Sequence, residues 1–241
     1  MTPAQQVSLL VPAAYLVGSV PFGLMVGRLK GIDPRTAGSG NIGASNVGRL
    51  LGRKFFVMVF LLDLLKGLLP MLLAGHVLRD AAPAARTYFV WLLVGFAAIF
   101  GHMFSVFLGF KGGKGVATSS GVILGLFPYF TIPGVIALAV WGVVLRGTGY
   151  ISVASIVAAV LFPVSYVLLS LVRGWPLLTE QLPLLVFSVL VAAMIVYKHR
   201  SNLARLRAGT EPRYDAPRAG AAGETAAREA DDAPPRPASA A

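Results

Sequence analysis

Long runs without a charged side chain set the strongest limit on how this chain can fold. Asp, Glu, Lys and Arg are all absent from residues 1–27, 87–110, 115–145, 147–172 and 181–197. A sixth run, 55–75, is apolar except for Asp63 and Lys66. A helix needs roughly 20 predominantly apolar residues to cross the hydrocarbon core of a bilayer. Most of these runs have the length of one membrane span, so the sequence predicts an all-α, polytopic membrane protein.

The composition agrees with a membrane location. Of 241 residues, 56% are hydrophobic and 13% are charged, whereas soluble domains carry about 25% charged and about 45–50% apolar residues. A disulfide-stabilised scaffold is excluded because the chain has no Cys. The first run, 1–27, contains no Lys or Arg, so it lacks the basic start of a cleaved signal peptide. We expect it to be a membrane span.

The run 115–145 allows two interpretations. Its 31 residues would form a helix about 46 Å long, which is too long for one untilted span. It also contains Pro128, Pro133 and Gly134, a cluster that is typical of turns. The run is therefore either one overlong helix, which gives six spans, or a helical hairpin, which gives seven.

The distribution of the 21 Lys and Arg residues separates these alternatives. Basic residues concentrate in the short cytoplasmic loops of membrane proteins. Six spans would place nine basic residues on one side and eight on the other, which is no bias. Seven spans place 14 on one side, in 28–54, 109–115, 146 and 198–213, against three on the other. The sequence thus predicts seven transmembrane helices, with the N-terminus outside and the C-terminus cytoplasmic.

The end of the chain has a different character. Residues 212–241 are rich in Ala, Pro, Arg and acidic side chains and have almost no large apolar side chain. Such a segment cannot bury enough apolar surface to fold. We expect a membrane domain over 1–211 and a disordered cytoplasmic tail over 212–241, whose role need not go beyond solubility.

Three segments of the predicted cytoplasmic face are unusual for loops. The first, GSGNIGASN over residues 38–46, is followed by Arg49. Small residues with exposed backbone N–H groups can form a nest around an anion, and the start of the following helix would add its dipole. A flexible Gly/Ser linker is the alternative. The candidate binding residues of this segment are Gly38, Ser39, Gly40, Asn41, Gly43, Asn46 and Arg49.

The second segment is GFKGGKGVAT, residues 109–118. Gly lets the backbone approach a ligand closely, and Lys supplies a point charge for phosphate. The segment is not a Walker A loop, whose pattern is G-x-x-x-x-G-K-[ST]. Leu108 stands where this pattern requires the first Gly, and Gly115 stands where it requires Ser or Thr. A basic membrane anchor with a tight turn would explain the two Lys but not the four Gly. The candidate binding residues are Lys111, Gly112, Gly113, Lys114, Gly115 and Thr118.

The third segment, 198–211, follows the last predicted span and begins with Lys-His-Arg. On a helix, His199, Asn202 and Arg205 would share one face. The His could accept a proton or hold a ligand by hydrogen bonds. A basic helix that contacts anionic lipid is the alternative, and it needs only the basic residues.

Metal binding and nucleic-acid binding are not expected. The chain has only three His, at 76, 102 and 199, and no cluster of acidic residues accompanies them. Asp63 and Lys66 lie one turn apart in a predicted span, which favours a structural ion pair within the membrane. Membrane orientation and phosphate binding explain the net charge of +11, so a nucleic-acid partner is not needed to account for it.

The motifs of this chain resemble the bacterial acyl-phosphate:glycerol-3-phosphate acyltransferase family. The similarity runs from about residue 10 to 211, in order and in spacing. It rests on GSVPFG (18–23), GSGNIGASN (38–46), DxxKG (63–67), GH (101–102), FKGGKGVAT (110–118) and KHRxNxxRL (198–206). Small departures are Ser45, where the family usually has Thr, and Leu203, where it usually has Ile.

The resemblance implies a seven-helix protein of the bacterial inner membrane whose active site faces the cytoplasm. It implies transfer of a fatty acyl group from acyl-phosphate to the 1-hydroxyl of glycerol 3-phosphate. The products are lysophosphatidic acid and phosphate, in the first acylation step of phospholipid biosynthesis. The family uses neither acyl-CoA nor acyl-carrier protein as donor, and it needs no metal or cofactor. A soluble enzyme that produces acyl-phosphate is an expected partner at the cytoplasmic face.

The resemblance also assigns site residues. The Ser and Arg of the family's first motif correspond to Ser39 and Arg49. Its glycine-rich acyl-phosphate loop corresponds to 112–115, together with Lys111 and Lys114. These assignments place one phosphate at each of the first two motifs.

The third motif corresponds to His199 and Asn202, with Glu211 in a structural role. A Ser after the fifth helix corresponds to Ser152, although Gly149 stands where the family usually has Arg. Acyl-phosphate is a mixed anhydride with a good leaving group, so direct attack by the acceptor hydroxyl needs no acyl-enzyme. Either His199 or a phosphate oxygen of the substrate then takes the hydroxyl proton.

Three other function classes compete with this one: an acyltransferase that uses acyl-CoA, a transporter and a structural anchor. The chain lacks the H-x-x-x-x-D dyad of acyltransferases that use acyl-CoA, since Ala81, Phe107 and Ala204 stand five residues after the three His. A transporter or channel for phosphorylated solutes also has many spans and basic sites, but its site would lie near the membrane midplane. A structural anchor for anionic lipid would leave the GSGN segment unexplained.

Overall fold

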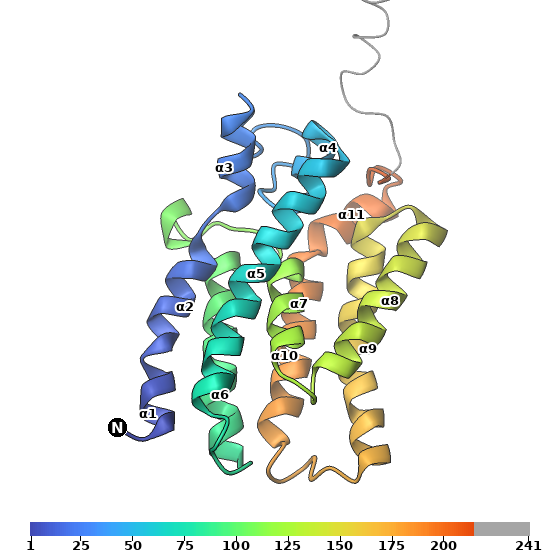
Figure 1. Cartoon of the computed structure of the whole chain (residues 1–241). Coiled ribbons are helices and arrows are strands. Elements are labelled where there is room, and N and C mark those ends of the chain that lie inside the picture. The colour runs from blue at the N-terminus through green and yellow to red at the C-terminus, as the bar shows by residue number, and fades with distance from the viewer. Residues whose placement is uncertain (215–241) are drawn as a thin grey trace, which may run out of the picture.

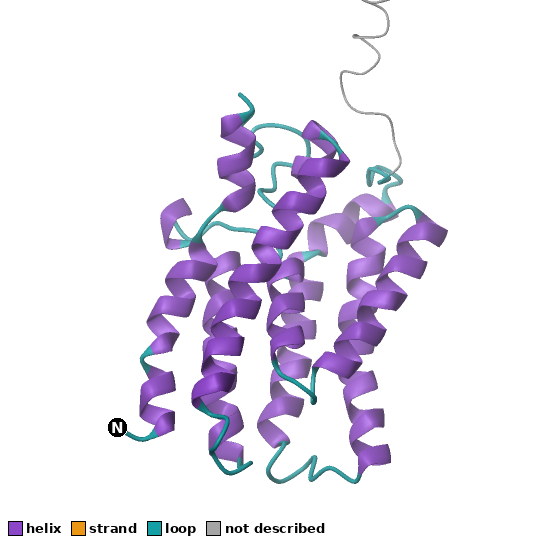
Figure 2. Ribbon diagram, in the orientation of Figure 1, coloured by secondary structure: helices purple, strands orange, loops and turns teal. Residues whose placement is uncertain are grey.

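The computed structural model describes residues 1–214, and within this range it contains helices and no strands (Figure 2). This confirms the prediction of an all-α protein. The bounds are α1 Pro3–Ser8, α2 Leu10–Ser19, α3 Phe22–Leu29, α4 Ala44–Leu51, α5 Arg53–Val77, α6 Ala85–Met103, η1 Val106–Leu108, α7 Val116–Gly125, α8 Thr131–Thr148, α9 Ile151–Arg173, α10 Leu182–Lys198 and α11 Arg200–Arg207. Most of the predicted tail, 215–241, lies outside the described residues.

Five helical segments in the described part of the chain are long and apolar enough to cross a membrane. They are Pro3–Leu29, Arg53–Val77, Ala85–Leu108, Thr131–Thr148 and Ile151–Arg173. Helices α10 and α11 make a sixth if the two, which meet at 49°, count as one broken span. The structure thus supports five or six spans, and the predicted number of seven and its orientation are not confirmed.

The run 115–145 is broken, so the single overlong helix is wrong. Helix α7 ends at Gly125 and α8 begins at Thr131. Pro128 lies in the turn, and Pro133 lies in the first turn of α8, where N–H groups have no partner within the helix. With ten residues, α7 is about 15 Å long, roughly half of the hydrocarbon core. Figure 1 shows α7 ending part-way along α6 and α10 before the chain turns back.

Glycine allows the closest helix pairs to approach each other. A Cβ on Gly67 of α5 would lie 2.2 Å from a backbone oxygen of α7, and one on Gly121 of α7 would lie 2.0 Å from a backbone oxygen of α5. Gly18 and Gly101 bring α2 and α6 together in the same way. Small residues at helix contacts are typical of membrane proteins, in which van der Waals packing drives helix association.

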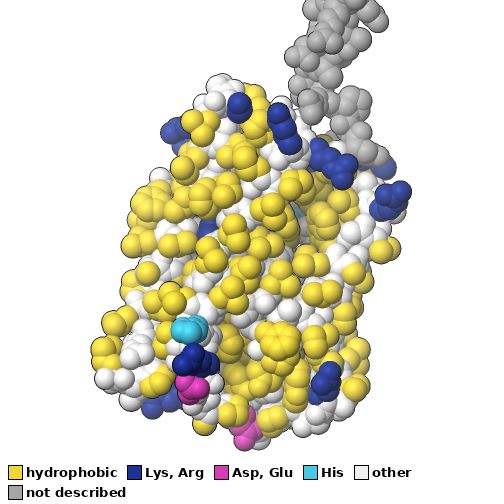
Figure 3. All heavy atoms as spheres, viewed as in Figure 1, with side chains coloured by type: hydrophobic (Ala, Val, Ile, Leu, Met, Phe, Trp, Pro, Cys, Tyr) yellow, Lys and Arg dark blue, Asp and Glu magenta, His cyan; other side chains and the backbone are white. Residues whose placement is uncertain are grey.

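Apolar side chains cover the outside of the helix bundle. Large hydrophobic side chains are exposed on α5, α8 and α9, among them Leu69, Leu72, Val143, Val160 and Leu171. Figure 3 shows this apolar surface in yellow, with most of the visible Lys and Arg at the end that carries α3, α4 and α11. Lipid chains can cover such a surface, whereas exposing it to water is unfavourable. The protein is a membrane protein.

The three motif segments lie at the same end of the bundle. Figure 1 shows the loop before α4, the loop before α7 and helix α11 at the end opposite the N-terminus. Side-chain contacts join these segments, from Lys114 to Asn202 and from Arg49 to Pro212. The hairpin of α7 and α8 returns the chain to the end from which it left, which is the arrangement that the charge count favoured.

Candidate functional site

Asn46 organises the first motif. It lies in α4 and is fully buried. Its amide nitrogen lies 2.8–3.0 Å from three carbonyl oxygens of the preceding loop, and its Oδ1 accepts a hydrogen bond from the Ser39 N–H at 2.8 Å. A Cβ on Gly38 would lie only 2.4 Å from that oxygen, so the position requires Gly. Asn46 therefore fixes the shape of the loop from within.

Ser39 and Arg49 face a cleft at the surface, which we call the surface cleft. It is also lined by Gly38, Ser45, Arg53, Phe56, Arg205 and Tyr214. Arg49 Nη2 donates to the Pro212 carbonyl oxygen at 3.2 Å, while its Nε is buried without a hydrogen-bond partner. Burial lowers the pKa of Arg49, and the charge of Glu211 opposes this shift. A guanidinium with an unmet donor is suited to bind an incoming anion.

The glycine-rich segment lies against the end of α6. The Gly113 N–H donates to the His102 carbonyl oxygen at 3.0 Å. A Cβ on Gly112 would lie 2.2 Å from that oxygen, and one on Gly113 would lie 2.1 Å from the His102 ring. Gly115 has a φ of 85° where α7 begins. Gly112 and Gly113 are thus required by contacts within the chain, a reason that the sequence does not predict.

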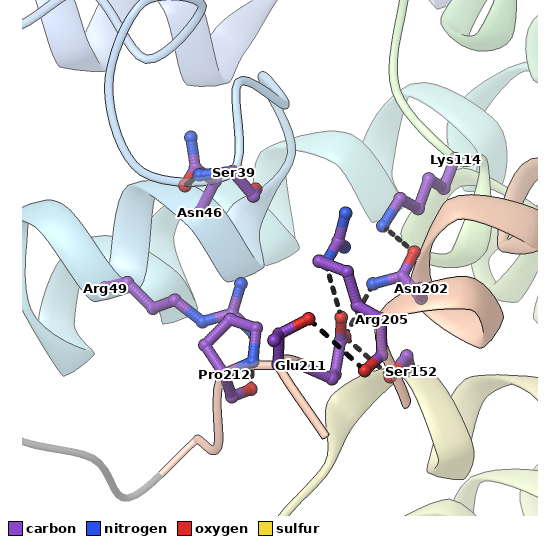
Figure 4. Close-up of polar contacts among 10 residues, drawn as sticks. Ser39, Asn46, Arg49, Lys114, Ser152, Asn202, Arg205, Glu211 and Pro212 are labelled. Carbon is purple, nitrogen blue, oxygen red and sulfur yellow. Dashed lines mark hydrogen bonds and ion pairs between the residues drawn. The ribbon is translucent and has the colours of Figure 1, made fainter. Parts of the chain in front are cut away.

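A hydrogen-bonded network links the second and third motifs (Figure 4). Lys114 Nζ donates to Asn202 Oδ1 at 2.5 Å, and Asn202 Nδ2 donates to Glu211 Oε1 at 2.6 Å. Ser152 Oγ donates to the same Glu211 oxygen at 2.8 Å, and Arg205 Nε donates to Glu211 Oε2 at 2.8 Å. Glu211 therefore joins α9 and α11, and through Asn202 it reaches the loop before α7.

Burial and the hydrogen bonds of this network shift two pKa values. Burial lowers the pKa of Lys114 to about 8, a shift that Glu211 opposes and that Arg205 and Arg49 reinforce. For Glu211, burial acts to raise the pKa, but the hydrogen bonds from Asn202, Ser152 and Arg205 prevail and hold it below its usual value. Several cations thus share one carboxylate, which leaves a positive potential that a bound phosphate would neutralise.

His199 lies at the bend between α10 and α11 and is 3% exposed. Its Nδ1 is 2.8 Å from the Ile195 carbonyl oxygen. A carbonyl oxygen only accepts hydrogen bonds, so this Nδ1 carries the hydrogen. In the neutral ring, Nε2 is then the nitrogen that can accept a proton.

Three cavities follow one another from the surface cleft inward. The surface cleft shares Ser45 and Phe56 with a second cavity, which we call the polar pocket. The polar pocket is also lined by Asn41, Gly43, Asp63, His102, Lys114 and His199. It shares Phe60, Val116, Trp141 and Ser155 with a third cavity between α5, α7, α8, α9 and α10, which we call the apolar pocket.

Two helix starts line the polar pocket. Residues 43–45 form the start of α4, and residues 115–117 form the start of α7. The first N–H groups of a helix have no partner within the helix and carry partial positive charge. Together with Lys114, these two helix starts suit the polar pocket to an anion.

Some predicted binding residues lie outside these cavities. Lys111 is exposed and lines none of the three, and Ser152 is buried beside Glu211. Thr118 is fully buried where α7 meets α5, and its hydroxyl has no hydrogen-bond partner. Gly40 lies in the loop before α4 with a φ of 69°. Within residues 1–214, no group of three or more His, Cys, Asp or Glu is placed to share a metal ion.

The structure adds residues to the site that the motifs did not single out. Pro212 and Tyr214 belong to the predicted tail, yet Pro212 binds Arg49 and the Tyr214 N–H donates to the Gly149 carbonyl oxygen at 2.7 Å. Trp141, at the junction of the polar and apolar pockets, donates to Ser155 Oγ at 3.2 Å. A residue that lines an apolar cavity gives no sequence signal in a span, because nearly every position there is apolar.

Comparison with known sequences points to one family. A family model described as glycerol-3-phosphate acyltransferase matches residues 8–209. The chain is 45% identical over 202 residues to a glycerol-3-phosphate acyltransferase of Geotalea daltonii, covering 84% of this chain and 94% of the relative. The same name belongs to a Trichlorobacter lovleyi relative, 47% identical over 206 residues with 86% and 96% covered. An Aquifex aeolicus relative of that name is 40% identical over 209 residues, with 85% and 97% covered.

Solved structures agree with the sequence comparison. The fold is similar to crystal structures of PlsY (YgiH), an integral membrane glycerol 3-phosphate acyltransferase. Its glycerol 3-phosphate form gives a TM-score of 0.73 at 40% identity, with 86% of this chain and 95% of that chain covered. Its lysophosphatidic acid form gives a TM-score of 0.71 at 39% identity with the same coverage. The resemblance of the motifs is thus confirmed, and the chain belongs to the glycerol-3-phosphate acyltransferase family of membrane enzymes.

Proposed function

We propose that this protein transfers a fatty acyl group from acyl-phosphate to the 1-hydroxyl of glycerol 3-phosphate. The products are lysophosphatidic acid and phosphate, in the first acylation step of phospholipid biosynthesis. The observation that carries the proposal is the order of the cavities, from a cationic cleft through a polar pocket to an apolar pocket. A phosphorylated acceptor, a reacting phosphate and a fatty chain need these environments in this order. The relatives' name and the two ligand forms of PlsY support the acceptor and the product.

The surface cleft holds the acceptor in this proposal. Arg49 can present two N–H groups to one phosphate once that phosphate replaces the Pro212 carbonyl oxygen. Ser39 lines the same cleft together with Gly38, and its hydroxyl is a further donor for the phosphate. Asn46 acts indirectly, because its amide holds this loop in shape.

The polar pocket holds the phosphate of the donor. Lys114 supplies the charge, and the start of α7 at 115–117, which lines the pocket, supplies N–H groups. Asn202 fixes the Lys114 ammonium by its hydrogen bond. The fatty chain then continues past Trp141 into the apolar pocket. Lys111, which is exposed, acts by attracting anions toward the site.

The chemical step needs no covalent intermediate with the protein. The 1-hydroxyl oxygen attacks the acyl carbonyl carbon, the bond between that carbon and the phosphate oxygen breaks, and phosphate leaves with the electron pair. The hydroxyl proton goes either to His199 Nε2 or to a phosphate oxygen of the substrate. The protein contributes by orienting the two substrates and by placing cations where negative charge develops.

We place the protein in the bacterial inner membrane with seven helices, the N-terminus outside and the site facing the cytoplasm. The support is the excess of basic residues in the segments at the site end, 14 against three. In this orientation a soluble enzyme that makes acyl-phosphate can deliver the donor to the face that uses it. A transporter is not favoured, because most of the visible Lys and Arg lie at the end of the bundle that carries the site (Figure 3), whereas a transport site lies near the membrane midplane.

The proposal is tested with purified protein, glycerol 3-phosphate and three donors offered separately: palmitoyl-phosphate, palmitoyl-CoA and palmitoyl-acyl-carrier protein. We expect lysophosphatidic acid from palmitoyl-phosphate alone. Arg49→Ala should abolish this product, and Arg79→Ala, at the opposite end of the bundle, should not. Product from palmitoyl-CoA with none from palmitoyl-phosphate would reject acyl-phosphate as the donor. Full activity of Arg49→Ala would reject the surface cleft as the acceptor site.

A further inference from the structure

Three ionisable side chains form a buried cluster between the spans, beside the polar pocket. Asp63, Lys66 and His102 are 3%, 3% and 5% exposed. Lys66 Nζ lies 2.9 Å from Asp63 Oδ1 and donates to the Val20 carbonyl oxygen, also at 2.9 Å. His102 Nδ1 lies 3.7 Å from the same Asp63 oxygen and has no hydrogen-bond partner. A charged side chain at this depth is unfavourable unless it is paired, and such side chains commonly have a functional role.

The cluster connects three separate elements. Asp63 and Lys66 belong to α5, and His102 belongs to the last turn of α6. Val20 lies at the break between α2 and α3, where its carbonyl oxygen is available to Lys66. An ion pair alone would need only the two residues of α5, so the position of His102 calls for a separate reason.

The glycine-rich loop packs directly against His102. Its carbonyl oxygen accepts the Gly113 N–H at 3.0 Å. Its ring fills the space directly under Gly113, since a Cβ there would lie 2.1 Å from Nε2. Lys114 follows next in the chain and lines the polar pocket together with Asp63 and His102. A change in the angle of the His102 ring would therefore move the backbone that carries Lys114.

We propose that Asp63 is a positioning residue that holds the His102 ring under Gly113 and thereby sets the place of Lys114 for the phosphate of the donor. The Asp63 carboxylate is the charged group that faces the unpartnered His102 Nδ1, so it biases the orientation of the ring. Lys66 compensates the charge of Asp63 and anchors the pair to the α2–α3 break. This inference rests on the proposed function, in which Lys114 binds the phosphate of acyl-phosphate.

The test uses a variant that separates positioning from ion pairing. Asp63→Asn alone would leave Lys66 charged without a partner and could prevent folding. The double variant Asp63→Asn with Lys66→Met removes both charges and keeps the side-chain sizes similar. We expect its thermal unfolding midpoint to stay near that of the unchanged protein. Its KM for palmitoyl-phosphate should rise about tenfold or more, because a small displacement of Lys114 weakens phosphate binding. Its KM for glycerol 3-phosphate should stay within about twofold.

A second variant and a control complete the test. His102→Gln leaves the Asp63–Lys66 pair intact, and we expect the same selective rise in the KM for palmitoyl-phosphate. Combining Asp63→Asn, Lys66→Met and His102→Gln should raise the KM for palmitoyl-phosphate little beyond the value of either variant, because the residues act as one unit. Tyr88→Phe is the control: Tyr88 lies on the same helix as His102 and donates a part-buried hydrogen bond to Tyr129. The substitution should lower the unfolding midpoint without changing either KM.

Three outcomes would overturn the inference. The first is an unchanged KM for palmitoyl-phosphate in both Asp63→Asn/Lys66→Met and His102→Gln. The second is an equal rise of both KM values, which would show a general structural role. The third is additive effects of the Asp63 and His102 substitutions. Failure of the proposed function gives a different result, because the unchanged protein would then make no lysophosphatidic acid from palmitoyl-phosphate.

Discussion

Glu211 is the residue on which the polar network of the site depends. Its two carboxylate oxygens accept hydrogen bonds from Ser152, Asn202 and Arg205, and it is 6% exposed. A buried acceptor that satisfies three donors stabilises the protein chiefly because its removal would leave those donors unpaired. Lys114, which lines the polar pocket, depends on this network through Asn202.

Glu211→Gln should therefore both destabilise the protein and reduce acyl transfer. The substitution removes the charge that pairs with Arg205 and turns one acceptor into a donor that faces other donors. We expect a loss of about 1–3 kcal/mol in the free energy of unfolding, measured by thermal or denaturant unfolding in detergent. Glu180→Gln is the matched control, because Glu180 is exposed in the loop before α10, and its effect should stay within about 0.5 kcal/mol. Similar losses in both variants would contradict this role of Glu211.

Lys114 should make acyl transfer sensitive to alkaline pH. Burial lowers its pKa to about 8, so the ammonium is charged below this pH and loses its proton as the pH rises through it. In our account kcat/KM for acyl-phosphate falls above about pH 8, because kcat/KM reports the ionisation of the free enzyme. Lys114→Arg keeps its charge to much higher pH, so any activity it retains should not show this fall. An alkaline fall that is identical in Lys114→Arg would assign the titration to another group.

The sequence predicted which residues line the cavities better than it predicted the contacts within the site. Ser39, Arg49 and Lys114 are recognisable because a Ser, Arg or Lys among glycines is unusual in so apolar a chain. The task of Asn46 was not predictable, since its partners are backbone carbonyl oxygens that carry no sequence signature. The same holds for Pro212, which binds Arg49 through its carbonyl oxygen across 163 positions of the chain.

At the scale of elements, the hairpin of α7 and α8 shows what charge counting can and cannot decide. The count favoured the hairpin, and the structure shows the break between α7 and α8. The two alternatives differ in the side on which Arg146, Arg173 and the five basic residues of 198–213 lie. It did not predict that the turn comes early, after only ten residues of α7. Pro128 lies in that turn and Pro133 within α8, and proline fits both positions, so composition alone could not place the break.

The contact between the glycine-rich loop and α6 gives a prediction for Gly112→Ala. The new methyl group would lie 2.2 Å from the His102 carbonyl oxygen, a backbone atom that cannot move alone. The loop must shift, so we expect a higher KM for acyl-phosphate and a loss of about 1–3 kcal/mol in the free energy of unfolding. Gly147→Ala in α8 is the control, because nothing lies within 4 Å of its Cβ position. Normal stability and KM values in Gly112→Ala would contradict the contact.

At the scale of the whole molecule, the three adjacent cavities suit a membrane protein to the proposed reaction. The surface cleft opens at the cationic end, and the apolar pocket lies between the spans. A fatty chain can stay among apolar side chains while its activated end meets a soluble acceptor. The sequence predicted that the three motif segments share one end of the bundle, as Figure 1 shows. It did not predict the cavities, since a residue that lines an apolar cavity gives no signal in a span whose other positions are mostly apolar too.

Ala137→Phe should make the enzyme discriminate against long acyl chains. Ala137 lines the apolar pocket and is 7% exposed, so a phenyl ring there takes the space of several methylene groups, each worth about 0.8 kcal/mol when buried. We expect a larger loss of kcat/KM for palmitoyl-phosphate than for butyryl-phosphate. Ala139→Phe is the control, because Ala139 is exposed on the same helix. Equal losses for both donors would place the fatty chain elsewhere.

The most direct test of the account is a rapid-mixing measurement of phosphate release from palmitoyl-phosphate. The enzyme is first mixed with palmitoyl-phosphate alone, and labelled glycerol 3-phosphate is added afterwards. Direct transfer predicts no rapid release of phosphate before the acceptor arrives, and then one phosphate for each lysophosphatidic acid formed. A burst of phosphate equal to the enzyme concentration before the acceptor is added would reveal an acyl-enzyme and contradict the account.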